Sequence, residues 1–266
     1  MGTCRNHPIS WETMDPLPFI FSIPHGSGRL PPGSRGLYAL TDQEIADSVD
    51  TGTLEIFGEL RVLGKVQAEW SRLVVDLNRS PRDRSPKGVV ALVDYQGRRI
   101  YLPEKEPAGA LLRERLRTYY LPYHRRLNAL LAAPGVLGLF DCHSLNGVGP
   151  IEAPDAGRRR RDINLGNRAL SERGAGTCPA RTLAALARSF EEQGFSVSLN
   201  DPYEGGFITA RYGRLLRRAG RFAVQIEINQ DLYVSGRGGL TDEERVIRTR
   251  KRVELALRRF SQWCVR

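Results

Sequence analysis

The sequence predicts an α/β fold in which a mixed, mostly parallel central sheet is sandwiched between helices. Short apolar runs typical of buried strands alternate along the chain with longer stretches of helical period. Two of these runs, 19–24 and 136–140, lead into a histidine and a glycine-rich turn. Thr41 and Thr241 are each followed three residues later by Glu, the capping-box pattern that opens a helix.

Composition limits the class of protein. With 266 residues, of which 41% are hydrophobic, the chain can bury one large core, and we expect a single domain over 1–266. The four cysteines form no Cys-x-x-Cys pair, so neither a zinc ribbon nor a disulfide framework fits. No signal-peptide pattern is present, and no apolar run approaches the roughly 20 residues of a membrane span. We therefore expect a cytoplasmic protein with no membrane partner.

The net charge of +10 comes from 40 Lys and Arg against 30 Asp and Glu, and nearly all of the cations are Arg. This excess suits a nucleic-acid surface or an anionic substrate, but Arg richness also follows from genome composition. The run 158–161 contains four arginines, for which a solvated loop is the simpler interpretation. Aromatic platforms for a nucleic-acid strand are not seen nearby, so a nucleic-acid partner is not expected.

The first elements place acidic side chains close behind a histidine. Strand 19–24 delivers His25, and the density of Pro and Gly in 29–36 indicates a loop. The helix that opens at Thr41 would carry three acidic residues on one face, Glu44, Asp47 and Asp50. After a weak point at 51–53, residues 54–63 continue in helical period.

A second polar edge is expected near the middle of the chain. Residues 71–77 are predicted to form a strand, and 82–99 a charged loop. The strand would end in polar side chains at the edge of the sheet, namely Asp76, Asn78 and Arg79.

The long stretch 104–133 is predicted to be a helix that packs on the sheet, with a kink at Pro122. His124 on this helix is more consistent with a packed or hydrogen-bonded core group than with a metal ligand. The central strand, 136–140, leads out through Asp141, His143 and Ser144.

The second half of the chain continues the alternation of strands and helices. The expected elements are a strand end or turn at 162–166, a helix at 179–193, a strand at 195–199, a short basic helix at 212–219, a buried strand at 222–228, and a helix capped by Thr241 that runs to about Trp263.

Two histidines at the carboxyl edge of a sheet, with carboxylates nearby, match a catalytic zinc site, which takes three protein ligands. His25 and His143 are the expected histidine ligands. No His-Glu-x-x-His or His-x-x-Glu pattern is present, because position 28 is Gly. Asp50, Asp47 and Asp141 are candidates for the third ligand, and Asp141 could instead orient a ligating histidine. The competing interpretation is that both histidines only form hydrogen bonds in loops.

Glu227 lies inside an otherwise apolar strand, where a carboxylate is costly unless it is paired or protonated. Burial would raise its pKa toward neutrality, as a general base requires. The alternative is an ion pair with a buried Arg. Arg79 is suited to clamp a substrate carboxylate, because its guanidinium binds two oxygens at once. Metal, base and clamp together describe hydrolysis of an acylated amino acid.

Six sequence blocks resemble the N-formylglutamate amidohydrolase family, in that family's order. They are SIPHGSG at 22–28, SRLVVDLNRSP at 71–81, DCHS at 141–144, DINLG at 162–166, NDPYEGGFIT at 200–209 and QIEIN at 225–229. The resemblance implies a zinc-exopeptidase-like fold related to carboxypeptidases and aspartoacylases. It also implies Zn²⁺ as cofactor and release of formate from N-formyl-L-glutamate.

The resemblance also implies roles for individual residues. The implied metal ligands are His25, His143 and Asp50, the implied catalytic base is Glu227, and the implied substrate-binding residues are Asn78, Arg79, Gly205 and Gly206. One position departs from the family pattern: Ala210 stands where the family has Arg, and Arg211 follows. If that Arg reads the second carboxylate of glutamate, Arg211 must reach from a shifted position or the substrate differs.

These observations predict a zinc-dependent amidohydrolase acting on a small anionic N-acyl amino acid, N-formyl-L-glutamate or a relative of it. A zinc carboxypeptidase or peptidoglycan-type amidase is an alternative. An inactive, basic binding module for an anionic partner is another. The sequence does not determine the oligomeric state.

Overall fold

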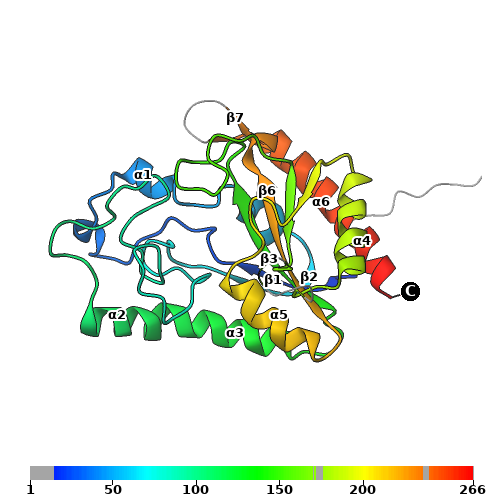
Figure 1. Cartoon of the computed structure of the whole chain (residues 1–266), viewed down its shortest axis with the longest axis horizontal. Helices are drawn as coiled ribbons and strands as arrows, with labels where there is room; N and C mark the ends of the chain where they lie inside the picture. The colour runs from blue at the N-terminus through cyan, green and yellow to red at the C-terminus, as the bar shows by residue number, and fades with distance from the viewer. Residues whose placement is uncertain (1–14, 170, 172–175, 236–239, 266) are drawn as a thin grey trace, which may run out of the picture.

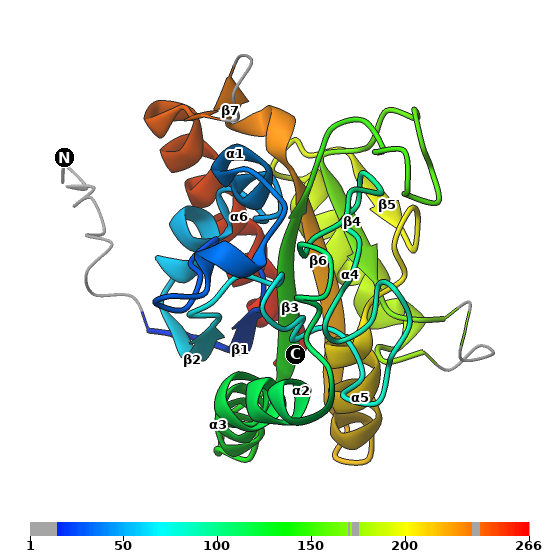
Figure 2. The same ribbon diagram turned by 90° about the vertical axis from the view of Figure 1, so that its left-hand side faces the viewer.

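The computed structural model describes residues 15–169, 171, 176–235 and 240–265. A six-stranded sheet lies at its centre, with strand order β2-β1-β3-β6-β4-β5, and Figure 2 shows this order from left to right. The strands are β1 Leu17–Ile23, β2 Val62–Gln67, β3 Gly138–Leu145, β4 Ile163–Gly166, β5 Val197–Leu199 and β6 Phe222–Asn229. Among the described strands of this sheet, only the β4–β6 pair is antiparallel, so the predicted mixed, mostly parallel sheet is confirmed.

Helices cover both faces of this sheet (Figure 1). The helices are α1 Asp42–Ala46, α2 Gly109–Arg115, α3 Leu121–Leu131, α4 Ala180–Glu191, α5 Phe207–Arg217 and α6 Glu243–Cys264. Helices α4 and α6 pack together on one face, while α3 and α5 lie on the other. Short elements complete the fold: 3₁₀ turns at Arg35–Leu37 and Gln230–Leu232, and the two-residue strands β7 Val234–Ser235 and β8 Leu240–Thr241. Within the described ranges, no helix is long and apolar enough to cross a membrane.

The alternation of side chains along the strands explains how polar groups come to lie in apolar runs. In β6, Val224, Ile226 and Ile228 face the α4 and α6 layer. Gln225 and Glu227, at the intervening positions, therefore face the side where α3 and α5 pack. The same alternation in β3 turns Asp141 and His143 to that side. The polar residues of the two strands thus share one face, and His143 is paired in register with Glu227.

The predicted strand at 71–77 is wrong. Its backbone forms turns, with the Val74 N–H bonded to the carbonyl oxygen of Ser71 and the Asp76 N–H bonded to that of Val89. The segment is apolar because Leu73 and Val75 pack in the core on the α3 side, not because it is a strand. The edge strand is instead β2, which begins at Val62 and so overlaps only the last two residues of the stretch 54–63 that we expected to be helical.

The acidic helix is shorter than predicted. The Thr41 capping box is present, with both of its hydrogen bonds to Glu44, but α1 ends at Ala46. Asp50 therefore lies beyond the helix, and its N–H donates to the carbonyl oxygen of His25 at 3.0 Å. A π-helical turn, Leu54–Gly58, follows before β2.

Boundaries of other elements also differ from the expectation. The long helix begins at Gly109, and a π-helical turn, Leu116–Tyr120, directly precedes the turn that contains Pro122. A proline has no N–H to donate to the preceding turn, so the irregularity falls where the kink was expected. The C-terminal helix is capped by Asp242, whose side chain accepts from the Arg245 N–H, and not by Thr241.

Candidate active site

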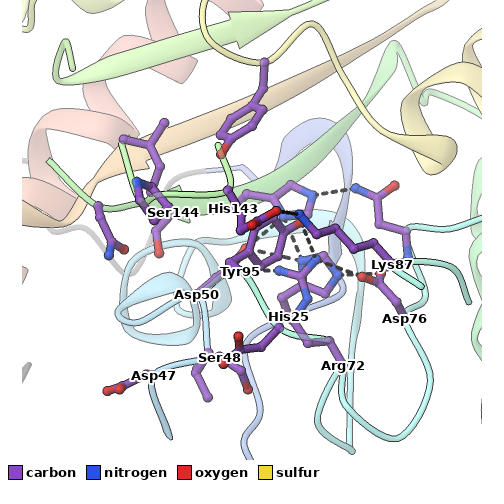
Figure 3. A pocket seen from close by; sticks show the side chains of 18 of the residues that line it. His25, Asp47, Ser48, Asp50, Arg72, Asp76, Lys87, Tyr95, His143 and Ser144 are labelled. Carbon is purple, nitrogen blue, oxygen red and sulfur yellow. Dashed lines mark hydrogen bonds and ion pairs between the residues drawn. The ribbon is translucent and has the colours of Figure 1, made fainter. Parts of the chain in front are cut away.

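A pocket of about 790 Å³ opens at the carboxyl ends of β1, β3 and β6. Strands and loops from the whole length of the chain supply its lining, from His25 to Gln230. Figure 3 shows His25, Asp50 and His143 gathered at the centre of this pocket, with Arg72 and Asp76 beside them. Parallel strands deliver their carboxyl ends to one edge, which is where ligands bind in open α/β sheets.

His25, Asp50 and His143 form the one described cluster whose geometry suits a metal ion, with one ligand atom from each residue within 4.8 Å of the others. The Nδ1 atoms of the two histidines are 3.2 Å apart. Oδ2 of Asp50 lies 2.8 Å from Nδ1 of His143 and 3.4 Å from Nδ1 of His25. All three residues are buried, with relative exposures of 8% or less.

Carboxylates hold the far side of each imidazole. Nε2 of His25 lies 2.8 Å from Oδ1 of Asp76, and Nε2 of His143 lies 3.3 Å from Oδ1 of Asp141. We assign the proton of His25 to Nε2, because a carboxylate can only accept. The lone pair of His25 then sits on Nδ1 and faces the other cluster atoms.

This arrangement fits a metal cation. Two imidazole nitrogens and a carboxylate oxygen converge here, and a bound cation would take the place of the proton that otherwise lies between Nδ1 of His143 and Oδ2 of Asp50. Asp141 is fully buried behind His143 and Asp47 is exposed at the pocket lining, so Asp50 is the candidate carboxylate that reaches the cluster.

Arg72 balances the charge of these carboxylates. Its guanidinium lies 2.8 Å from Oδ2 of Asp76 and 3.5 Å from Oδ1 of Asp50. Burial opposes the charged form of Asp76, but Arg72 and His25 hold the pKa of this carboxyl well below its usual value. Burial likewise opposes a charged His143, but Asp141 and Asp50 raise the pKa of His143 well above its usual value.

Glu227 stands opposite His143 in the sheet and lines the same pocket. Gln225 donates from Nε2 to Oε1 of Glu227 at 2.8 Å, which fixes the carboxyl group. Burial raises the pKa of Glu227 to about 8, although the nearby His143 acts in the opposite direction. The alternative, an ion pair between Glu227 and a buried Arg, is not recorded among the described residues, although the charge of Arg160 also opposes the rise in pKa.

Asn78 and Gly206 are in the pocket lining and pack against each other. A Cβ on Gly206 would lie 2.4 Å from Nδ2 of Asn78, so a larger residue could not be accommodated there without a shift. The Oδ1 atom of Asn78 accepts from the Ile208 N–H at 2.8 Å, and its Nδ2 lies 3.1 Å from Nε2 of His143. The neighbouring Gly205 also lines the pocket and has φ of +117°, a conformation that favours glycine.

Of the two arginines predicted to bind substrate, Arg79 lines the pocket and Arg211 does not. Arg79 lines the pocket, with its side chain 37% exposed, and donates to the Tyr95 hydroxyl at 3.2 Å. Arg211 is exposed on α5, with its guanidinium over the rings of Phe207 and Tyr212, and does not line the pocket.

Sequence reasoning gave no role to several pocket residues. Arg72, Tyr95 and Tyr203 lie in loops, where no periodic pattern marks a functional residue. Arg160 belongs to the arginine run that we expected to be a solvated loop, but its side chain is 2% exposed and pairs with Asp155 at 2.6 Å. A carboxylate five positions before an Arg is too common a pattern to have revealed this pair.

Comparison with known proteins gives a consistent result. A family model described as N-formylglutamate amidohydrolase matches residues 17–234. N-formylglutamate deformylase from Pseudomonas aeruginosa is 32% identical over 233 residues, with 82% of each chain covered. The protein of the same name from Pseudomonas putida is 29% identical over 236 residues, again with 82% of each covered.

Solved structures agree with the fold. The crystal structure of N-formylglutamate amidohydrolase from Ralstonia eutropha JMP134 matches with a TM-score of 0.75 at 22% identity, covering 95% of this chain and 96% of that one. This likeness shows a shared fold, and the family model and the curated relatives extend over most of the chain. The resemblance noted from six sequence blocks is therefore confirmed, and the chain belongs to the N-formylglutamate amidohydrolase family.

Proposed function

We propose that this protein hydrolyses the amide bond of N-formyl-L-glutamate to formate and L-glutamate, using a zinc ion held by His25, Asp50 and His143. The observation that carries this proposal is the convergence of two imidazole Nδ1 atoms and one carboxylate oxygen in a pocket that also contains Glu227. The names of the curated relatives support the choice of substrate.

His25, Asp50 and His143 would hold the zinc ion, which would supply Lewis acidity to the amide carbonyl and to the attacking water. Glu227 takes a proton from that water and delivers it to the leaving amine nitrogen. Its raised pKa suits both steps, because a base with a pKa near neutrality can accept and release a proton at working pH. Gln225 holds the carboxyl group in place for this transfer.

Arg79 binds the α-carboxylate of the substrate. Its guanidinium is half-buried in the pocket lining and anchored by the Tyr95 hydroxyl. Its backbone carbonyl accepts from the Tyr120 hydroxyl at 2.8 Å, which fixes the start of the side chain. Asn78 positions this part of the pocket lining, because its Oδ1 already accepts from the Ile208 N–H and its side chain packs against Gly206.

The test is release of formate from N-formyl-L-glutamate by the zinc-supplied protein, with Glu227→Gln as a matched variant. We expect the wild type to turn over and the variant to lose about 10²- to 10⁴-fold in kcat while keeping its metal. N-acetyl-L-glutamate, assayed in parallel, determines whether the acyl group must be formyl. Absence of formate release from a metal-loaded wild type would contradict the proposal.

A further inference from the structure

The proposed substrate carries two carboxylates, so this inference rests on the proposed function and asks which residue reads the second one. Arg211 does not reach the pocket. The pocket is lined by five Lys and Arg side chains, Arg72, Arg79, Lys87, Arg98 and Arg160.

Three of these five cations are engaged by buried carboxylates. The pairs are Arg72 with Asp76 at 2.8 Å, Arg98 with Asp94 at 2.6 Å, and Arg160 with Asp155 at 2.6 Å. The three carboxylate side chains are only 5–6% exposed. Turning any of these arginines toward a ligand would leave a buried charge without its partner, which is strongly unfavourable.

Of the five cations, Arg79 and Lys87 remain as candidates to bind the carboxylates of the substrate. Among the described residues, the carboxylate recorded near Arg79 is that of Asp76, at 4.0 Å, and the proposed function assigns Arg79 to the α-carboxylate. Lys87 pairs with Glu152, and this ion pair is open to solvent, with side chains 36% and 41% exposed. Exposed ion pairs contribute little net free energy, so Lys87 can exchange Glu152 for another carboxylate at small cost.

The loop that carries Lys87 is fixed by a hydrogen bond to the segment that carries Asp76 and Arg79. The carbonyl oxygen of Val89 accepts from the Asp76 N–H at 2.7 Å, and the carbonyl oxygen of Ser85 accepts from the Gly88 N–H at 2.8 Å. Lys87 therefore starts from a defined position beside the segment that carries Asp76 and Arg79, and Figure 3 draws it on that side of the pocket. Glu152 also lines the pocket, from a different loop.

We propose that Lys87 is the specificity residue that binds the side-chain carboxylate of the substrate, with Glu152 holding the ammonium until the substrate arrives. A dianionic substrate then meets two cations: Arg79, whose distance to the buried Asp76 is long at 4.0 Å, and Lys87, whose partner Glu152 is exposed. Glu152 is released to solvent, where its charge is hydrated.

The test compares N-formyl-L-glutamate with its neutral isostere N-formyl-L-glutamine, in the wild type, Lys87→Met and Glu152→Gln. Lys105→Met is the matched control, because Lys105 is exposed and outside the pocket lining. Hydrolysis gives kcat and KM. Calorimetric binding of both compounds in a Glu227→Gln background measures recognition without turnover.

Loss of one charge-assisted contact should lower kcat/KM of Lys87→Met for formylglutamate by about 10- to 100-fold, mainly through KM. The formylglutamine value should stay within about threefold, and Glu152→Gln should improve formylglutamate binding. Equal losses for both compounds, or unchanged selectivity, would overturn the role of Lys87. A wild type that hydrolyses neither compound would overturn the proposed function, while the binding selectivity would still decide the role of Lys87.

Discussion

The Nδ1 atoms of His25 and His143 lie 3.2 Å apart, although 118 positions separate the two residues in the chain. β1 and β3 are neighbours in the sheet and run parallel, so both deliver their histidines to the same edge. The turn after α1 adds Asp50, whose N–H is bonded to the carbonyl of His25. The backbone of the fold, and not a local motif, therefore assembles this cluster.

The first prediction concerns metal content. Purified wild type supplied with zinc should hold about one ion per chain, and His25→Ala, Asp50→Ala and His143→Ala should each lose it, because each removes one of three ligands. Elemental analysis after removal of loose metal measures this. His124→Gln is the matched control, since His124 lies outside the cluster. Equal metal in the control and in all three variants would exclude this cluster as the site.

A second prediction tests the carboxylate behind His25. Asp76→Asn should weaken metal affinity by about 10- to 100-fold, because Asp76 sets the orientation and proton position of that imidazole. Competition with a chelator of known affinity measures the change. Asp47→Asn serves as control, since Asp47 is an exposed carboxylate of the same pocket. If the Asp47 variant loses as much affinity as the Asp76 variant, the orienting role is wrong.

The sequence predicted the strands that carry the site, because β1, β3 and β6 are apolar runs of strand length bounded by turn residues. The same signal failed for 71–77, where Leu73 and Val75 are buried by loop packing. The edge strand β2 escaped prediction because most of it is only partly buried, and its pairing with β1 defines it. The local pattern of apolar residues indicates which segments are buried. Whether a buried segment is a strand or a loop depends on whether it pairs with another strand.

Prediction of the site from the sequence is limited in the same way. His25, Asp50 and His143 could be named from strand ends and the family resemblance, and the structure brings them together. The contacts of Arg72 depend on how the 71–79 loop folds, which no pattern reports. Arg211 could not be judged from sequence, because adjacent helix positions differ in direction by about 100°. Ala210 points inward on α5, and Arg211 is exposed.

A third prediction concerns acid stability and His124, which α3 buries against Tyr212 and the carbonyl of Leu77. Burial lowers the pKa of His124 to about 4 from 6.5. Between these values the unfolded state binds a proton that the folded state does not, so the free energy of unfolding should fall as pH drops from 6.5 to 4. The full effect is about 3 kcal/mol.

Urea unfolding of wild type and His124→Gln at several pH values tests this. The variant should lose less stability than the wild type across the window, because glutamine does not titrate. The comparison is between slopes, so a general loss of stability in the variant does not affect it. Parallel slopes would show that His124 is not the group responsible.

The last prediction is that the carboxyl of Glu227 destabilises the metal-free protein near neutral pH. Burial raises its pKa to about 8 from 4.5. Between these values the folded state keeps a proton that the unfolded state releases, so the free energy of unfolding should fall as pH rises across the window. Glu227→Gln removes this titration and should become increasingly more stable than the wild type, by up to about 4 kcal/mol from pH 5 to pH 8.

Urea unfolding of the metal-free proteins measures the difference. Glu204→Gln is a control, because Glu204 lines the same pocket but is only half-buried, beside Arg168. A difference between wild type and Glu227→Gln that stays constant with pH would show that Glu227 has an ordinary pKa. In that case the carboxylate would be a poor match for a base that must also return its proton to the leaving amine, because groups that do both work best with a pKa near the working pH.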